Sequence, residues 1–419
     1  MKSSKLASLS EQLIWACVSF FIPFQLFILP GASPSPRLMD GLLVLAPLFL
    51  IKLLLERGIR ERVNLRLVVV FFAFLSVWLI RDLASGEFSW IVISVRGMLG
   101  ACFGLVIVLK METLPLRRII VFGLSCGAIV SVMVLVLQWR GFYQQTVSLG
   151  MAAVAELEDT SVLRTYFRFP GMHGHSNASA AVAGLSIPLV LGFIAERRLG
   201  LLWAVFPFAA YGITAALTLT RSPAFAVAGT VLIFVLAAKG SVASRFLRFV
   251  AIFGVGLTVG YILYVKYIDR IDDAQNVASN AFFRIETMMA SIDLSLRYPF
   301  GLGSAAKNAL YAEESVFTTH NAWLLLANQG GIFYVLFVLS LYGVGFIRSW
   351  KCGDMVSLHL IVFVLIVSQF EEHFMNPVFM VINGMIIGRG LLRPQPSSQR
   401  LGRLIKESMH RETNLEISR

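Results

Sequence analysis

The feature that most constrains this fold is a long apolar segment that recurs along almost the whole chain. A helix that spans a bilayer needs about 20 mostly apolar residues. Inside lipid the backbone must pair with itself, and the alternating pattern of a β-barrel is absent from these segments. We therefore predict an all-α polytopic membrane protein with about 12 transmembrane helices. The segments lie near residues 13–30, 41–56, 65–80, 90–109, 119–138, 176–195, 200–219, 223–238, 249–265, 321–347, 355–370 and 376–392.

The composition excludes a soluble domain as the main body of the protein. Of the 419 residues, 57% are hydrophobic and only 14% are charged, whereas soluble domains carry about 25% charged residues. The net charge of +12 is therefore interpreted through its distribution across the membrane. We expect membrane lipids, and no nucleic acid, as partners. No small-residue cleavage pattern follows the first apolar run, so we predict a retained first helix.

Lysine and arginine predict the orientation, because they accumulate in cytoplasmic loops. With a cytoplasmic N-terminus, 24 of the 36 basic residues fall on the cytoplasmic side. Both termini are then cytoplasmic, and two long loops face outward, at 140–175 and 266–320. The predicted order is helices 1–5 within 1–139, the first loop at 140–175, helices 6–9 within 176–265, the second loop at 266–320, helices 10–12 within 321–392 and a basic cytoplasmic tail at 393–419. Residues Phe282 to Leu296 suit an amphipathic helix against the membrane surface or over a cavity.

Arginines on the outward side require an explanation, because the charge rule disfavours them there. Arg221 is held in a very short turn between two apolar helices, and Arg168 precedes the helix that begins near Ser176. Each has two interpretations. The first is a side chain that reaches lipid phosphates. The second is an anion site, since the planar guanidinium binds phosphate with two parallel hydrogen bonds.

Histidines offer the clearest acid–base candidates, because their proton exchanges near neutral pH. His320 ends the second long loop and opens directly into an apolar helix. It suits a general base, but also a helix-entry residue that Asn321 helps to cap. His373 follows Glu371 and Glu372 on the outer side, where the carboxylates would orient a histidine, bind a sugar hydroxyl or form a solvated turn. His173 and His175 lack further ligands nearby, so we expect exposed loop histidines and no metal site.

Four stretches, in this order, resemble the O-antigen ligase and polymerase superfamily of bacterial inner-membrane glycosyltransferases. The likeness covers roughly Arg164 to Phe346, and its last stretch is the most specific. In many relatives a glutamate precedes the glycines after the His-Asn motif, whereas Asn328-Gln329-Gly330-Gly331 stands here. The stretches are Arg168-Phe169-Pro170-Gly171 leading to Asn177, Leu217 to Ser222, Asn280 to Arg284 running on to Pro299-Phe300-Gly301-Leu302-Gly303, and His320-Asn321-Ala322-Trp323-Leu324.

The resemblance implies a GT-C-like fold and a reaction at the periplasmic face of the bacterial inner membrane. A glycan would move, with inversion, from undecaprenyl diphosphate to an acceptor sugar hydroxyl, without a metal or other cofactor. His320 would deprotonate the acceptor, and Arg221, Arg284 and Arg168 would hold the diphosphate. Asn321, Glu371, Glu372 and His373 are candidates for acceptor binding or support. These residue types suit the roles, since a base needs a pKa near the working pH and cations stabilise a departing diphosphate.

Three functions remain open at this point. A ligase would transfer the glycan to lipid A–core, whereas a polymerase would extend a lipid-linked glycan. Some polymerases carry, in their outer loops, an arginine followed by a glycine eleven positions later. None of the outward arginines here has that spacing, and its absence favours a ligase. A polytopic transporter of anions or lipid-linked glycans is the alternative of another class, although no internal repeat supports it.

Overall fold

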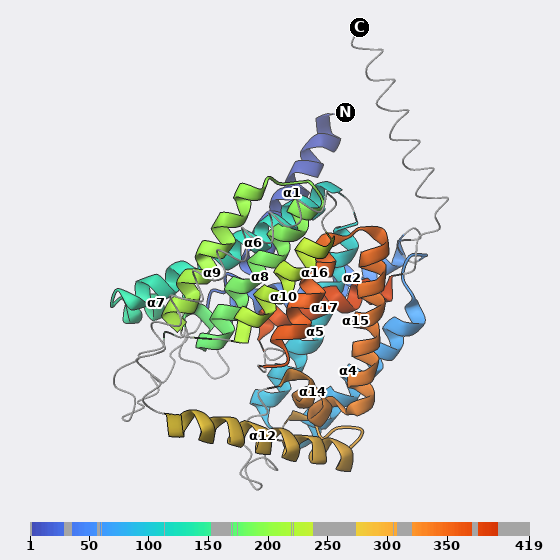
Figure 1. The fold of residues 1–419 in the computed structure, drawn as a ribbon. Coiled ribbons are helices and arrows are strands. Elements are labelled where there is room, and N and C mark those ends of the chain that lie inside the picture. Colours follow the sequence, from blue (N-terminus) through green and yellow to red (C-terminus); the bar gives the residue numbers. More distant parts are fainter. Residues whose placement is uncertain are drawn as a thin grey trace.

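A computed structural model provides the fold (Figure 1). It describes residues 2–28, 36–56, 59, 61–112, 114–151, 169, 171–173, 175–218, 220, 222–237, 274–304, 306–307, 321–370 and 376–392. Across these ranges the chain is helical and forms no β-strand; two isolated bridges, Phe27 to Arg37 and Val63 to Leu392, join loop segments. The predicted all-α class is confirmed.

Most helices of the first half follow the apolar segments closely, but the expected span 13–30 is wrong in its bounds, because α1 already begins at Lys2 and ends at Phe21. Pro23 lies just beyond the end of α1, and the chain turns there before α2 begins. The helices are α1 (Lys2–Phe21), α2 (Leu38–Leu55), α4 (Leu65–Ser85), α5 (Phe88–Lys110), α6 (Leu114–Trp139), α7 (Tyr143–Ser148), the 3-10 turn η1 (Gly171–His173) and α8 (Ser176–Ala195).

The described part of the second half contains six apolar helices and one amphipathic helix. The elements are η2 (Leu201–Ala204), α9 (Val205–Thr218), α10 (Ser222–Ala237), α12 (Ala274–Arg297), α14 (Ala322–Gly330), α15 (Ile332–Cys352), α16 (Met355–Val367) and α17 (Pro377–Leu391). Figure 1 shows α12 lying across one end of the bundle, roughly perpendicular to the long helices.

Seven of the described helices are long and apolar enough to cross a membrane, and four shorter helices are also apolar. The protein is thus an α-helical, multi-pass membrane protein by length and composition. The expected segment at 249–265 lies outside the described residues, so the count of twelve spans stays a prediction.

One expected span, 321–347, is wrong as a single helix. The chain breaks at Gly331, whose φ of 95° is left-handed, and α14 and α15 are separate elements. The nine residues of α14 extend about 14 Å, which is too short to cross the roughly 30 Å hydrocarbon core. Only α15 has the length of a span.

Small residues hold the centre of the bundle together. A side chain at Gly104 on α5 would meet the backbone oxygen of Val381 on α17 at 2.2 Å, and one at Gly384 would meet the oxygen of Ala101 at 2.7 Å. Close backbone approach of this kind is typical of helix pairs in membranes, where packing replaces the hydrophobic effect. Helices α5 and α17 therefore form a rigid support for the elements around them.

The two ends of the bundle carry different described groups. At one end Lys110 pairs with Glu11, and Arg117 pairs with Glu196 and Asp354; we call it the Arg117 end. The other end carries α12 (Figure 1), and we call it the α12 end.

Candidate functional site

Helix α14 begins directly after the His-Asn pair of the sequence motif, and Asn321 caps its first turn. Asn321 lies in extended backbone, and its side-chain oxygen accepts hydrogen bonds from the backbone nitrogens of Trp323 at 2.9 Å and Leu324 at 3.1 Å. These are two of the amides that a helix leaves unpaired at its start. Asn321 is buried, so its observed role is support of the helix entry.

The same residue ties α14 to the end of α16. The backbone nitrogen of Ala322 donates to the oxygen of Ser368 at 2.9 Å. The side-chain nitrogen of Asn321 donates to the backbone oxygen of Gln369 at 3.4 Å. The start of α14 is thereby held beside the last turn of α16.

The start of α10 meets the same place from the other side. The rings of Phe225 and Phe370 stack with centroids 5.3 Å apart. Just before α10, the hydroxyl of Thr218 lies 2.9 Å from the hydroxyl of Thr220. Three segments that each adjoin a predicted site residue therefore meet at the end of α16: the start of α10, the start of α14 and the end of α16 itself.

Most of the predicted site residues lie outside the described residues: His320, Arg221, Arg168, Glu371, Glu372 and His373. Their sequence neighbours are described. Asn321 follows His320, Thr220 precedes Arg221, and Phe370 precedes Glu371. Asn321 and Phe370 lie at the end of α16, where Phe225, four residues after Arg221, stacks on Phe370. The predicted roles of the six residues stay untested.

The turn Pro299 to Gly303 is a tight junction between α12, α14 and α15. The backbone nitrogens of Leu302 and Gly303 donate to the oxygens of Asn328 and Gln329 at 2.8 and 2.9 Å. A side chain at Gly301 would lie 2.4 Å from the nitrogen of Gly331, and the φ of Gly301 is 78°. Only glycine fits such backbone-on-backbone contact at positive φ without strain.

Helix α4 supports this turn from its last two turns. The carboxylate of Asp82, fully buried, accepts from the backbone nitrogen of Ser304 at 2.6 Å and from the hydroxyl of Ser94. Trp78 donates its indole hydrogen to the hydroxyl of Ser304 at 3.0 Å, and Arg81 donates to the oxygen of Gly301 at 2.6 Å. The sequence reasoning missed Asp82; its only signal was a charged pair, Arg81-Asp82, at the end of an apolar run.

The two amides that precede Gly330, Asn328 and Gln329, have different surroundings. Asn328 donates to the hydroxyl of Ser291 at 2.5 Å and accepts from that of Ser295 at 2.6 Å, which joins α14 to α12. Gln329 is fully buried, and both of its side-chain polar atoms lack a hydrogen-bond partner. Asn328 thus holds α12, while Gln329 carries no charge into the core.

The described outward arginines divide by their partners. Arg96 forms a two-point ion pair with Asp40, at 3.0 and 2.6 Å, and Arg140 stacks over the ring of Trp139 at 4.8 Å. Arg297 pairs with Asp293. Arg284, which is exposed, has no ion pair or hydrogen bond within the described part of the chain. Its guanidinium is available to a ligand.

The expectation of exposed loop histidines is wrong for His173. His175 is exposed and caps α8 by accepting from the nitrogen of Asn177 at 3.3 Å. His173 is buried, neither ring nitrogen has a hydrogen-bond partner, and burial followed by the charge of Arg37 lowers its pKa to about 3. The turn Gly171–His173 is pulled inward because the nitrogen of Gly171 donates to Gln138 at 2.9 Å.

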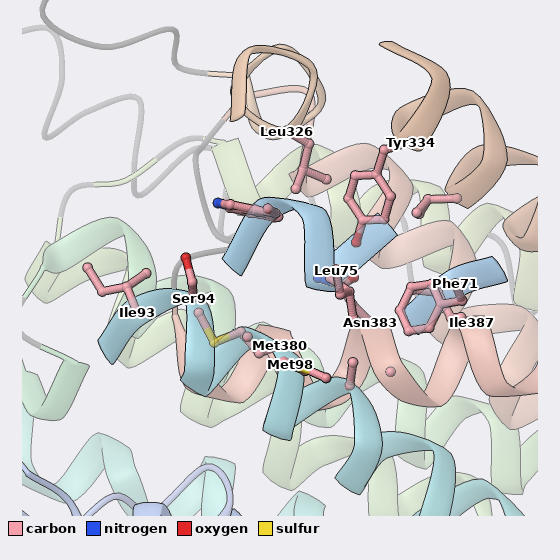
Figure 2. A pocket seen from close by; sticks show the side chains of 15 residues that line it. Phe71, Leu75, Ile93, Ser94, Met98, Leu326, Tyr334, Met380, Asn383 and Ile387 are labelled. Atoms are coloured by element: carbon pink, nitrogen blue, oxygen red, sulfur yellow. The ribbon is translucent and has the colours of Figure 1, made fainter. Parts of the chain in front are cut away.

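An apolar pocket lies on the other side of α14, between α4, α5, α15 and α17 (Figure 2). Its volume is about 60 Å³. Leu326 of α14 and Tyr334 of α15 cover it, and Figure 2 shows Ser94 and Met98 on the α5 side. The amide of Asn383, which accepts from the hydroxyl of Tyr342, is among the few polar groups in a wall otherwise suited to hydrocarbon.

Among the described residues, no group of three or more histidine, cysteine or acidic side chains is arranged to hold a metal ion. In comparisons with known proteins, no family model and no curated protein matches the chain. The site is therefore interpreted from its own residues.

Proposed function

We propose that the protein is a membrane glycosyltransferase that moves a glycan from undecaprenyl diphosphate to an acceptor hydroxyl at the α12 end. The observation that carries the proposal is the meeting, at the end of α16, of three segments that each adjoin a predicted site residue. Asn321 bonds to Gln369, Ala322 bonds to Ser368, and Phe225 stacks on Phe370. His320, Arg221 and Glu371 each adjoin one of these segments in sequence.

The chemistry that fits this arrangement is a direct displacement. In the proposal, His320 takes the proton of the acceptor hydroxyl as its oxygen forms a bond to the anomeric carbon. The bond from that carbon to the diphosphate oxygen breaks, and the diphosphate leaves with the electron pair. Arg221, Arg284 and Arg168 would stabilise the leaving charge. Arg284 supports the proposal because it is an exposed cation with no described partner.

The acceptor is proposed to be lipid A–core, which makes the protein an O-antigen ligase of the bacterial inner membrane. A polymerase that extends lipid-linked O-antigen or exopolysaccharide uses the same donor chemistry. Deleting the gene separates the two. A ligase deletion loses all glycan attached to lipid A and accumulates lipid-linked polymer. A single repeat on the core, or loss of free polymer, identifies a polymerase.

The histidine is tested with purified protein, a lipid-diphosphate glycan and acceptor. Replacing His320 with alanine (His320→Ala) should abolish release of undecaprenyl diphosphate, because the acceptor hydroxyl then has no base. The matched control is His175→Ala, which changes an exposed histidine at the same end of the bundle. If His320→Ala kept near-normal release in metal-free buffer, the assignment of the base would be wrong.

A further inference from the structure

Helix α12 has three separate faces. Thr287, Ser291, Leu294 and Ser295 are buried against the bundle. Glu286, Asp293 and Arg297 are exposed and charged on a second face. The third face is apolar and exposed, although such a stripe on a helix normally packs against protein. It consists of Phe282, Ile285, Met289, Ile292 and Leu296, with exposed fractions of 68, 58, 62, 38 and 66%.

The placement of these faces is unusual for a helix that packs on a protein. At about 100° per residue, the apolar stripe is turned roughly 110° around the helix from the buried serines. Polar side chains join α12 to the bundle, through Ser291 and Ser295 to Asn328. The apolar stripe therefore cannot cover a cavity of the bundle, and it needs another apolar partner.

The stripe continues onto a surface that faces lipid. Beyond Leu296, Phe300 is 65% exposed and contacts the ring of Phe333, with centroids 5.3 Å apart. Phe333 begins the exposed stripe of α15, which continues through Leu336 and Ile347. Because α15 has the length and composition of a membrane span, hydrocarbon must cover this stripe.

From this continuity we propose that α12 is an interfacial helix whose apolar stripe is inserted into the membrane leaflet at the α12 end. The bundle would then lie on one side of the helix, lipid on the other, and water over the charged face, as for amphipathic helices in membrane interfaces. Arg284 lies on the face of Thr287 and Ser291, since they are three and seven residues apart. The leaflet would thus keep that cation turned toward the bundle.

The test uses the full chain in bilayer nanodiscs of phosphatidylethanolamine and phosphatidylglycerol. The native cysteines are replaced by alanine, and a single cysteine carrying an environment-sensitive nitrobenzoxadiazole dye is placed on α12. Met289→Cys and Ile285→Cys probe the stripe, Asp293→Cys probes the charged face, and Leu336→Cys reports a lipid-facing position on α15. Lipids with a nitroxide near the top of the acyl chain, and iodide in water, serve as quenchers.

Dyes at 285 and 289 should be quenched by the nitroxide lipids nearly as well as the dye at 336, and at least about twofold more than the dye at 293. Iodide should show the reverse order. The proposal is overturned if iodide reaches 289 as readily as 293. It is equally overturned if protection of 289 appears only in discs that hold two copies, because a second chain would then cover the stripe.

Discussion

At the scale of one residue, Gln329 is a buried amide side chain that the fold accommodates without a hydrogen bond. Its side chain is fully buried with neither polar atom bonded, and an unpaired buried polar group costs about 1–3 kcal/mol. Its backbone oxygen, by contrast, accepts from Gly303. The position therefore accommodates an uncharged amide, whereas a charged side chain there would destabilise the fold.

Two substitutions at Gln329 test this view. Gln329→Met should raise the free energy of unfolding by about 1 kcal/mol, because it removes an unpaired polar group of similar size. Gln329→Glu should lower it by about 3 kcal/mol, because a carboxylate at this fully buried position would lose its hydration. Thermal unfolding of the purified variants in one detergent checks both. An equally stable glutamate variant would contradict the geometry.

His173 gives a pH dependence of stability. Its pKa is about 3 in the folded protein, through burial and then the charge of Arg37, against about 6.5 when unfolded. Below pH 6.5, His173 therefore binds a proton in the unfolded chain but stays neutral in the folded protein. The contribution of His173 to the free energy of unfolding is therefore fully present above pH 6.5. It falls by about 1.4 kcal/mol per pH unit as the pH drops toward 3.

In the variant His173→Gln this contribution disappears. Between pH 7 and 4.5 the variant should lose about 2.5 kcal/mol less stability than the wild type, as measured by thermal unfolding across that range. His175→Gln, at the exposed neighbour, should keep the wild-type slope. Identical slopes for the wild type and His173→Gln would show that His173 titrates normally.

At the scale of elements, the decisive feature is the junction where α12, α14 and α15 meet. Gly331 separates α14 from α15, and the nitrogen of Ile332 donates to the oxygen of Pro299 at 2.9 Å. This bond inserts the turn after α12 into the break between the two helices. The position of α12 over the bundle depends on that break.

Gly331→Ala should therefore be strongly destabilising. The φ of Gly331 is 95°, and an added carbon would lie 2.5 Å from the carbonyl carbon of Phe300. We expect a loss of about 3 kcal/mol or more, from backbone strain and overlap together. Gly343→Ala on α15 is the control, since nothing lies within 4 Å of its added carbon. That change should be neutral or slightly stabilising, because alanine favours a helix.

At the scale of the whole molecule, the Arg117 end is closed by a buried ionic cluster. Arg117 contacts Glu196 and Asp354 at 2.5 Å each, and Arg389 joins Asp354 to Glu112 at 2.9 and 2.8 Å. Burial by itself would raise the pKa of Asp354, but Arg389 and Arg117 outweigh it and lower that pKa. The cluster links the ends of α6, α8, α16 and α17.

Removing the central cation should weaken the whole bundle. Arg117→Gln removes the cation from the buried carboxylate of Asp354 and the partly buried one of Glu196, so we expect a loss of about 3 kcal/mol in the free energy of unfolding. Lys110→Gln breaks the exposed pair with Glu11 and should cost under about 1 kcal/mol. Equal effects of the two variants on the unfolding temperature would refute a special role for the cluster.

The sequence by itself determined the helical class and most helix positions, because hydrophobicity is a local signal. The predicted segment 176–195 is the helix Ser176–Ala195, whereas the outward orientation of the two long loops stays a prediction. Asn321 as a helix cap was also within reach, since a cap and the amides it bonds are neighbours in sequence. The roles of His320 and Arg221 remain predictions.

Only the tertiary structure decided which polar side chains pair with other parts of the chain and which stay exposed to solvent. The pairing of Arg96 with Asp40, the support of Ser304 by Asp82 and the burial of His173 involve residues far apart in the chain. Such contacts leave no periodic trace in a sequence. The same holds for α12: its amphipathic pattern was visible, but the fold alone turned its serines inward and its apolar stripe outward, because Asn328 binds those serines.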